Sequence, residues 1–161
     1  MPRTVTREIL DAYVGRDIAD ICPNKYGTRA ENHCAHFVGH ALELQHGMLC
    51  GDMKYATRHT GASLRCNELY NDLQQTGPWA QAPGQQDGLL LFVTLNSNMT
   101  GNTMGQATRK HVGIVFGGKV YNYGNTGHAV RCEPTVDSFK TRMGHAYGGL
   151  DQVSFFYAVP R

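Results

Sequence analysis

Residues 31–42 read Glu31-Asn32-His33-Cys34-Ala35-His36-Phe37-Val38-Gly39-His40-Ala41-Leu42. The apolar side chains of this segment recur at helical spacing and are Cys34, Phe37, Val38, Ala41 and Leu42. The spacing predicts an amphipathic helix with Cys34 at its start, on the inward face. A helix N-terminus carries partial positive charge, which favours a thiolate over a thiol and makes the sulfur a nucleophile near neutral pH. Cys34 is therefore a candidate catalytic nucleophile.

A partner for this thiol lies further along the chain, at His111. Residues 111–116 have the bias toward β-branched and aromatic side chains that is typical of a strand. A thiol at a helix start that faces an imidazole on a strand can carry out covalent acyl transfer. Such a site also needs a group that holds the imidazole, and Asn122, on the next predicted strand, is the first candidate for this role. Asn125 is the alternative.

An oxyanion that develops during acyl transfer needs hydrogen-bond donors. The backbone N–H of Cys34 is the expected first donor, because the first amides of a helix have no partner within it. The second donor is expected from Tyr26, Asn32 or His33, and we favour Tyr26.

The order of the predicted elements indicates an α+β fold. Helices are expected over about residues 6–21, from Cys34 to near Gly47, from a cap at Ser63 to residue 77, and over residues 136–143. Strands are expected over residues 89–95, 111–116, 120–123 and 153–159, with a hairpin turn at Gly117-Gly118 and a long loop over 96–110. The 161 residues are expected to form one domain, 1–161.

Composition excludes several classes of protein. The formal net charge is only +2, and no basic run suggests a surface that follows phosphates, so nucleic acid is not an expected partner. No apolar run is long enough to span a membrane. The first residues lack the apolar core of a secretory signal, so we expect synthesis in the cytoplasm and, if the chain is exported, a leaderless route.

The five cysteines and eight histidines allow further chemistry. With Cys34 as nucleophile, Cys22, Cys50, Cys66 and Cys132 remain. They are interpreted equally well as buried thiols or as disulfides, with Cys50–Cys66 the first pairing to consider. His36 and His40 would share a helix face and could bind a transition metal with His33 or His46. Since neither an H-E-x-x-H nor a C-x-x-C motif is present, we expect no metal and no cofactor.

The segments together resemble the papain-like cell-wall amidases and endopeptidases of the NlpC and CHAP type. The resemblance lies in residues 32–38, with Cys34 in the nucleophile position, and in residues 87–92, which look like the first core strand of that family. It continues in residues 111–115, which carry the general base His111, and in residues 120–122, which carry the third catalytic residue. Many relatives have histidine where this chain has Asn122.

The resemblance implies a papain-like fold, with the nucleophile helix packed on an antiparallel sheet. It implies hydrolysis of an amide bond in peptidoglycan stem peptides through an acyl-enzyme on Cys34, in the periplasm or cell wall of a target cell. A monomeric hydrolase of this kind is similar to amidase toxins injected into rival bacteria, such as type VI secretion effectors, or to phage lysis components. A toxin would have a cognate immunity protein as partner. The alternatives are a cysteine protease or deamidase that acts on a protein, and a non-catalytic binding protein of the same fold.

Overall fold

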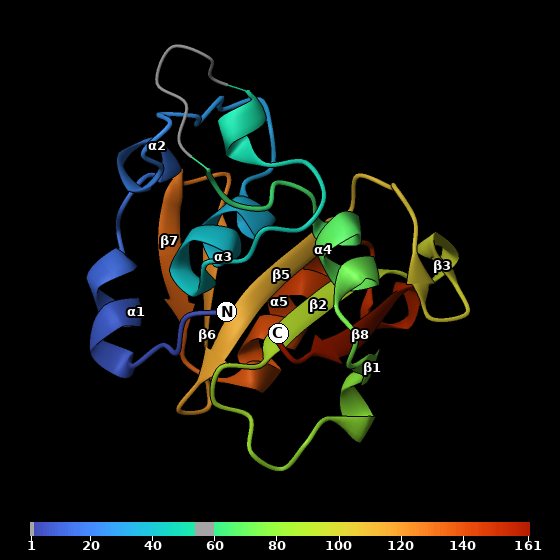
Figure 1. The fold of residues 1–161 in the computed structure, drawn as a ribbon. Coiled ribbons are helices and arrows are strands. Elements are labelled where there is room, and N and C mark those ends of the chain that lie inside the picture. The colour runs from blue at the N-terminus through green and yellow to red at the C-terminus, as the bar shows by residue number, and fades with distance from the viewer. Residues whose placement is uncertain (1, 54–59) are drawn as a thin grey trace.

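The computed structural model describes residues 2–53 and 60–161 and has an α+β architecture (Figure 1). Its centre is a six-stranded sheet in the order β1-β8-β2-β5-β6-β7, in which all neighbouring strands are antiparallel. The strands are β1 (Thr76–Pro78), β2 (Leu90–Leu95), β5 (Lys110–Phe116), β6 (Lys119–Gly124), β7 (Ala129–Glu133) and β8 (Val153–Ala158). A separate small hairpin consists of β3 (Met99–Thr100) and β4 (Thr103–Met104).

Helices cover both faces of this sheet. They are α1 (Arg7–Tyr13), α2 (Ile18–Ile21), α3 (Cys34–Leu42), α4 (Cys66–Asp72) and α5 (Val136–Ala146), with short 3-10 turns η1 (Cys50–Asp52), η2 (Trp79–Gln81), η3 (Asn96–Asn98) and η4 (Leu150–Gln152). In Figure 1, α3 and α4 lie in front of the sheet and α5 lies behind it. None of the described helices is long and apolar enough to cross a lipid bilayer.

The two faces of the sheet bury two separate apolar clusters. Successive side chains of a strand point to opposite faces, so Leu90 and Phe92 pack with α3 and α4, whereas Leu91 and Val93 pack with α5. The apolar run that begins at Leu89 is therefore continuous because β2 is covered on both sides. The predictions of strands in 89–95, 111–116, 120–123 and 153–159 and of a helix in 136–143 are confirmed.

The predicted helices of the N-terminal half are wrong at their ends. The segment 6–21 is two helices, α1 and α2, because the chain turns at Gly15, whose φ of 86° lies in the left-handed region. Helix α3 ends at Leu42 instead of near Gly47, because the next residue, Glu43, adopts a left-handed conformation. The third helix begins at Cys66, because the Ser63 hydroxyl accepts from the His46 N–H and donates to the Leu44 carbonyl and so does not cap it.

Residues 96–110 are more ordered than the predicted loop. They contain η3 and the β3–β4 hairpin, and the Asn98 side chain connects them. Its amide nitrogen donates to the Thr94 hydroxyl and the Gly105 carbonyl, while its oxygen accepts from the Ala107 N–H. These hydrogen bonds hold the segment that precedes His111 in a defined conformation.

Strands β1 and β7 were not expected from the sequence.

The register of β5 and β6 places His111 and Asn122 on one face of the sheet. Gly113 lies opposite Asn122, and His111 precedes Gly113 by two residues, so all three lie on the α5 side. A β-carbon at Gly113 would lie 2.6 Å from Val120 Cγ1 and 3.2 Å from Asn122 Cβ. Glycine at this position therefore leaves room for the amide of Asn122 to reach the imidazole.

Replacement of Gly113 by alanine is expected to lower the free energy of unfolding by about 1–3 kcal/mol, because the added methyl group has no space between two strands. Urea denaturation measures this change. Gly84→Ala is the matched control, since a β-carbon there meets nothing within 4 Å. Equal stability of the two variants would contradict the tight contact at Gly113.

Candidate active site

Cys34 is the first residue of α3 and is buried, with 2% of its surface exposed. Its backbone N–H donates to Asn32 Oδ1 over 2.9 Å, and Asn32 Nδ2 donates to the carbonyl of Lys110 at the start of β5. The preceding amide, of His33, donates to Asn125 Oδ1. Two asparagine side chains therefore connect the start of α3 to the strands that carry His111 and Asn122.

His111 forms a hydrogen bond through Nε2 with Asn122 Oδ1 at 2.9 Å, and its ring stacks on Phe139 of α5. Arg142 Nη2 also reaches Asn122 Oδ1, at 3.1 Å, and Arg142 is held by an ion pair with Glu133. A guanidinium can only donate, so the atom that it meets is the amide oxygen, and His111 must donate to the same oxygen from Nε2. In the neutral imidazole, Nδ1 is then the lone-pair nitrogen.

The surroundings of Cys34 favour its thiolate. The pKa of the Cys34 thiol lies well below its usual value, because Cys66 donates a hydrogen bond to the sulfur. The His111 side chain and the Val112 backbone N–H also lower this pKa, and together the contacts outweigh burial, which acts in the opposite direction. The pKa of Cys66 itself is raised, chiefly by burial and then by the neighbouring Cys34 sulfur. These directions favour a thiolate at Cys34 and a protonated thiol at Cys66.

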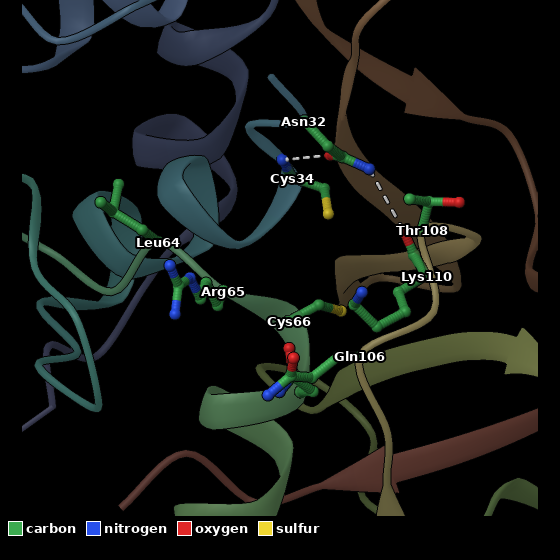
Figure 2. Close-up of a pocket in the computed structure, with 9 residues that line it drawn as sticks. Asn32, Cys34, Leu64, Arg65, Cys66, Gln106, Thr108 and Lys110 are labelled. Carbon is green, nitrogen blue, oxygen red and sulfur yellow. Dashed lines mark hydrogen bonds between the residues drawn. The ribbon is translucent and has the colours of Figure 1, made fainter. Parts of the chain in front are cut away.

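Two cavities flank these residues and share Asn32 and Thr108 as lining residues. The Cys34 cavity, of about 280 Å³, is shown in Figure 2, where the sulfurs of Cys34 and Cys66 point into it from two different helices. The His111 cavity, of about 270 Å³, lies between β5, β6 and α5. We call the two together the Cys34–His111 groove.

The Cys34–His111 groove is lined by basic side chains. Arg65 and Lys110 line the Cys34 cavity, and Arg109, Arg131 and Arg142 line the His111 cavity. Within the part of the chain that the structure describes, no aspartate or glutamate lines either cavity. Since Arg65 and Arg142 are ion-paired with glutamates, the positive charge comes from the other three side chains, and it favours an anionic ligand.

The two expected oxyanion donors, the Cys34 N–H and the Tyr26 hydroxyl, are both engaged in other hydrogen bonds. The Cys34 N–H is already engaged by Asn32, so it is not the unpaired amide that we expected. The Tyr26 hydroxyl donates to Glu31, burial and this contact raise the pKa of Tyr26 to about 12, and its ring packs edge-on against His33. Tyr26 is not among the described residues that line the Cys34–His111 groove. Its role as an oxyanion donor stays a prediction.

All five cysteines lie in the described residues and are free thiols, so the pairing of Cys50 with Cys66 is wrong. Cys66 lies beside Cys34, while Cys50 lies 3.6 Å from Cys22. Cys50 and Cys66 therefore lie in different parts of the molecule. The alternative, that these residues are buried thiols, is confirmed for Cys22, Cys50 and Cys66.

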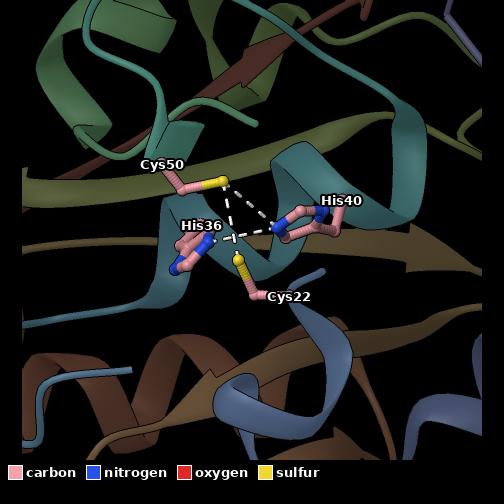
Figure 3. A group of neighbouring side chains, drawn as sticks. All are labelled: Cys22, His36, His40 and Cys50. Carbon is pink, nitrogen blue, oxygen red and sulfur yellow. Dashed lines mark hydrogen bonds between the residues drawn. The ribbon is translucent and has the colours of Figure 1, made fainter. Parts of the chain in front are cut away.

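A second group of polar side chains lies between α3, the end of α2 and the start of η1. His36 and His40 face the same side of the helix, as their spacing predicts, and they meet Cys22 and Cys50 (Figure 3). Burial lowers the pKa of His36 and so favours its neutral ring. The sequence indicates the histidine pair but not the two cysteines, because these are far apart in the chain and form no local motif. Cys66 and Arg142 were missed for the same reason.

Comparison of the chain with protein-family models, with curated proteins and with solved structures finds no match.

Proposed function

We propose that this chain is a cysteine hydrolase that cleaves an amide bond of peptidoglycan stem peptides, with Cys34 as nucleophile, His111 as general base and acid, and Asn122 as the residue that orients the ring. The observation that carries the proposal is the 2.9 Å hydrogen bond between His111 Nε2 and Asn122 Oδ1 beside the Cys34 sulfur. This bond leaves Nδ1 of the neutral imidazole to receive the thiol proton.

In the first half of the reaction, the Cys34 sulfur attacks the carbonyl carbon of the scissile amide while its proton resides on His111 Nδ1. His111 then protonates the leaving amine, and the acyl group remains on the sulfur as a thioester. In the second half, His111 takes a proton from water, the hydroxide attacks the thioester, and the proton returns to the sulfur. Asn122 accepts from Nε2–H throughout and stabilises the imidazolium.

Arg142 is a positioning residue in this scheme. Its guanidinium donates to the oxygen of Asn122, while Asn122 Nδ2 donates to the Val120 carbonyl. Both ends of the amide are therefore fixed, and the group cannot rotate to present its nitrogen to His111. The ion pair with Glu133 in turn holds the guanidinium.

The choice of a stem peptide as substrate is supported by charge. Stem peptides carry free carboxylates, and Arg109 and Arg131 line the His111 cavity beside the reacting groups. Arg109 immediately precedes β5, so its position relative to His111 is set by the strand. A cationic groove binds a carboxylate-bearing peptide and repels a cationic one. An antibacterial effector or lysis factor is the biological role that fits such an activity.

Muropeptide analysis tests the proposal. Purified sacculi are incubated with the wild-type chain or with Cys34→Ala, digested with a muramidase, and separated by liquid chromatography with mass detection. We expect the wild type to release fragments that have gained one water at a stem-peptide amide, and the variant to release none. The identity of the fragments also gives the bond that is cut.

The same residues would serve a protease or deamidase, so the assay includes a protein arm. A mixture of unfolded proteins is incubated in parallel and analysed for new termini and for glutamine-to-glutamate conversion. If the sacculi stay intact while the proteins are changed by the wild type and not by Cys34→Ala, the substrate is a protein and the stem-peptide proposal is wrong. No change in either arm, with Cys34 no more reactive than a free thiol, would leave a non-catalytic binding protein.

A further inference from the structure

Four potential metal ligands from three parts of the chain converge on one point beside α3, on the side that faces α2 and η1. Cys22 follows α2, His36 and His40 project from α3, and Cys50 begins η1. Their sulfur and ring-nitrogen atoms all lie within 4.8 Å of one another, and Figure 3 shows them directed toward a common centre. Cys22, His36 and Cys50 are fully buried, and His40 is half-buried.

The distances between these atoms are those of a tetrahedral zinc site. With Zn–S bonds of about 2.3 Å and Zn–N bonds of about 2.05 Å at tetrahedral angles, two sulfurs lie about 3.8 Å apart, a sulfur and a nitrogen about 3.6 Å, and two nitrogens about 3.3 Å. Cys22 Sγ and Cys50 Sγ are 3.6 Å apart, and Cys50 Sγ and His40 Nε2 are 3.6 Å apart. The His36 and His40 Nε2 atoms are 3.1 Å apart.

Hydrogen bonds outside the cluster determine which ring nitrogen of His36 carries the proton. The Thr28 carbonyl lies 2.7 Å from His33 Nε2, so His33 must donate from this nitrogen. In a neutral His33 ring, Nδ1 is then an acceptor, and it lies 3.2 Å from His36 Nδ1. His36 therefore carries its proton on Nδ1 and presents the lone pair of Nε2 to the centre of the cluster. A ligating histidine whose other nitrogen donates to a fixed acceptor is the usual arrangement around protein-bound zinc.

Hydrogen bonds to Cys50 favour its thiolate in the same way. The Ala62 backbone N–H lies 3.2 Å from Cys50 Sγ and the Asn24 side-chain amide 3.5 Å from it, in addition to the contact with Cys22. A sulfur that accepts from two N–H groups is stabilised as an anion, which is the form that binds a metal ion. The cluster is therefore arranged to carry negative charge at a buried position, where a cation would compensate it.

We propose that Cys22, His36, His40 and Cys50 bind one Zn²⁺ ion as a structural site. Two thiolates and two imidazoles in tetrahedral arrangement are the ligand set of structural zinc. Both sulfurs bind as thiolates, so binding releases to solvent the proton that Cys22 donates to Cys50, and no electron transfer is involved. All four positions are filled by the protein, so the ion has no open position for a substrate.

The site would crosslink the segments before and after the nucleophile helix. Zinc would join the end of α2 and the start of η1 to α3, and His36 follows Cys34 by two residues. The ion would therefore fix the helix start without touching the reacting atoms. This proposal does not depend on the proposed hydrolase activity, because it concerns ligands on the opposite side of α3.

The experiment uses the full chain without a histidine tag, purified and dialysed against buffer with Zn²⁺, followed by removal of free metal. Elemental analysis is expected to give one zinc per chain. After acid or chelator removal, Co²⁺ is expected to bind with the visible bands of a tetrahedral site and a thiolate charge-transfer band. Thermal unfolding is expected to occur about 5 °C or more lower in the apo chain than in the zinc-loaded chain.

Variants locate the ion. Cys22→Ser and His40→Gln are expected to lose stoichiometric zinc, whereas Cys132→Ser, His46→Gln and Cys34→Ala are expected to retain it. If a ligand variant does not fold, the cobalt spectrum of the wild-type chain still decides, because it reports thiolate ligation directly. The proposal is overturned if the wild-type chain binds neither zinc nor cobalt at micromolar concentration, if Cys22 and Cys50 form a disulfide, or if the metal leaves with Cys34→Ala. Since these readouts need no substrate, their result is independent of whether sacculi are cleaved.

Discussion

Replacement of Cys34 by alanine is expected to reduce release of stem-peptide fragments by about 10⁴-fold or more, because removal of a covalent nucleophile leaves only binding and electrostatic contributions. The fold is expected to persist. The side chain is small and buried, so its truncation costs about 1–2 kcal/mol of stability, and the Asn32 bond to the Cys34 backbone does not depend on the sulfur. Fragment release per unit time from purified sacculi measures the first effect, and thermal unfolding measures the second.

Cys132→Ala is the matched control for this result. Cys132 lies on β7, at the edge of the sheet, where its thiol donates to the Glu133 carbonyl and contacts the Tyr121 hydroxyl. It lines neither the Cys34 cavity nor the His111 cavity. Its replacement is expected to leave fragment release unchanged within about twofold. If Cys34→Ala released fragments at the wild-type rate, Cys34 would not be the nucleophile and the proposed mechanism would be wrong.

Replacement of His111 by glutamine is expected to lower turnover by about 10²–10⁴-fold, the range that general acid–base catalysis contributes. It is also expected to change the reactivity of Cys34. His111, after Cys66, lowers the pKa of the Cys34 thiol. Without the imidazole this pKa rises toward that of an ordinary thiol, so a smaller fraction of Cys34 is thiolate at neutral pH. The pH at which iodoacetamide alkylates Cys34 at half its maximal rate therefore moves upward.

This midpoint is measured by mass spectrometry of the peptide that contains Cys34, after timed alkylation at a series of pH values. His145→Gln, on an exposed position of α5, is the matched control and is expected to leave the profile in place. An unchanged alkylation midpoint in His111→Gln, with full turnover, would show that the imidazole and the sulfur do not act together.

Elements that are determined by local pattern could be predicted from the sequence. The continuous apolar run of residues 89–95 predicted β2, because a strand covered on both faces needs apolar side chains at every position. The two glycines at 117 and 118 predicted the β5–β6 hairpin, and both have positive φ. This hairpin is also what brings His111 and Asn122 together, so the central pair of the candidate site followed from a local signal.

Features that depend on distant contacts could not be predicted. Arg142 reaches Asn122 from α5, and Cys66 reaches Cys34 from α4, and neither residue has a neighbour in sequence that marks its role. Cys22 and Cys50 meet because α2 and η1 fold against the same face of α3. The pairing of the Cys34 N–H with Asn32 was missed for a different reason, since a side chain two residues earlier can occupy a helix-start amide that pattern alone leaves open.

Helix α3 presents different chemistry on successive turns. Eight of its nine residues are buried, and only His40 is half-exposed. Each residue of an α-helix is rotated by about 100° from the one before it. An insertion or deletion of one residue between Cys34 and His40 would therefore turn either the sulfur away from His111 or the imidazoles away from their two cysteines. A chain that uses both proposed sites therefore has to keep the spacing Cys-x-His-x-x-x-His as a unit.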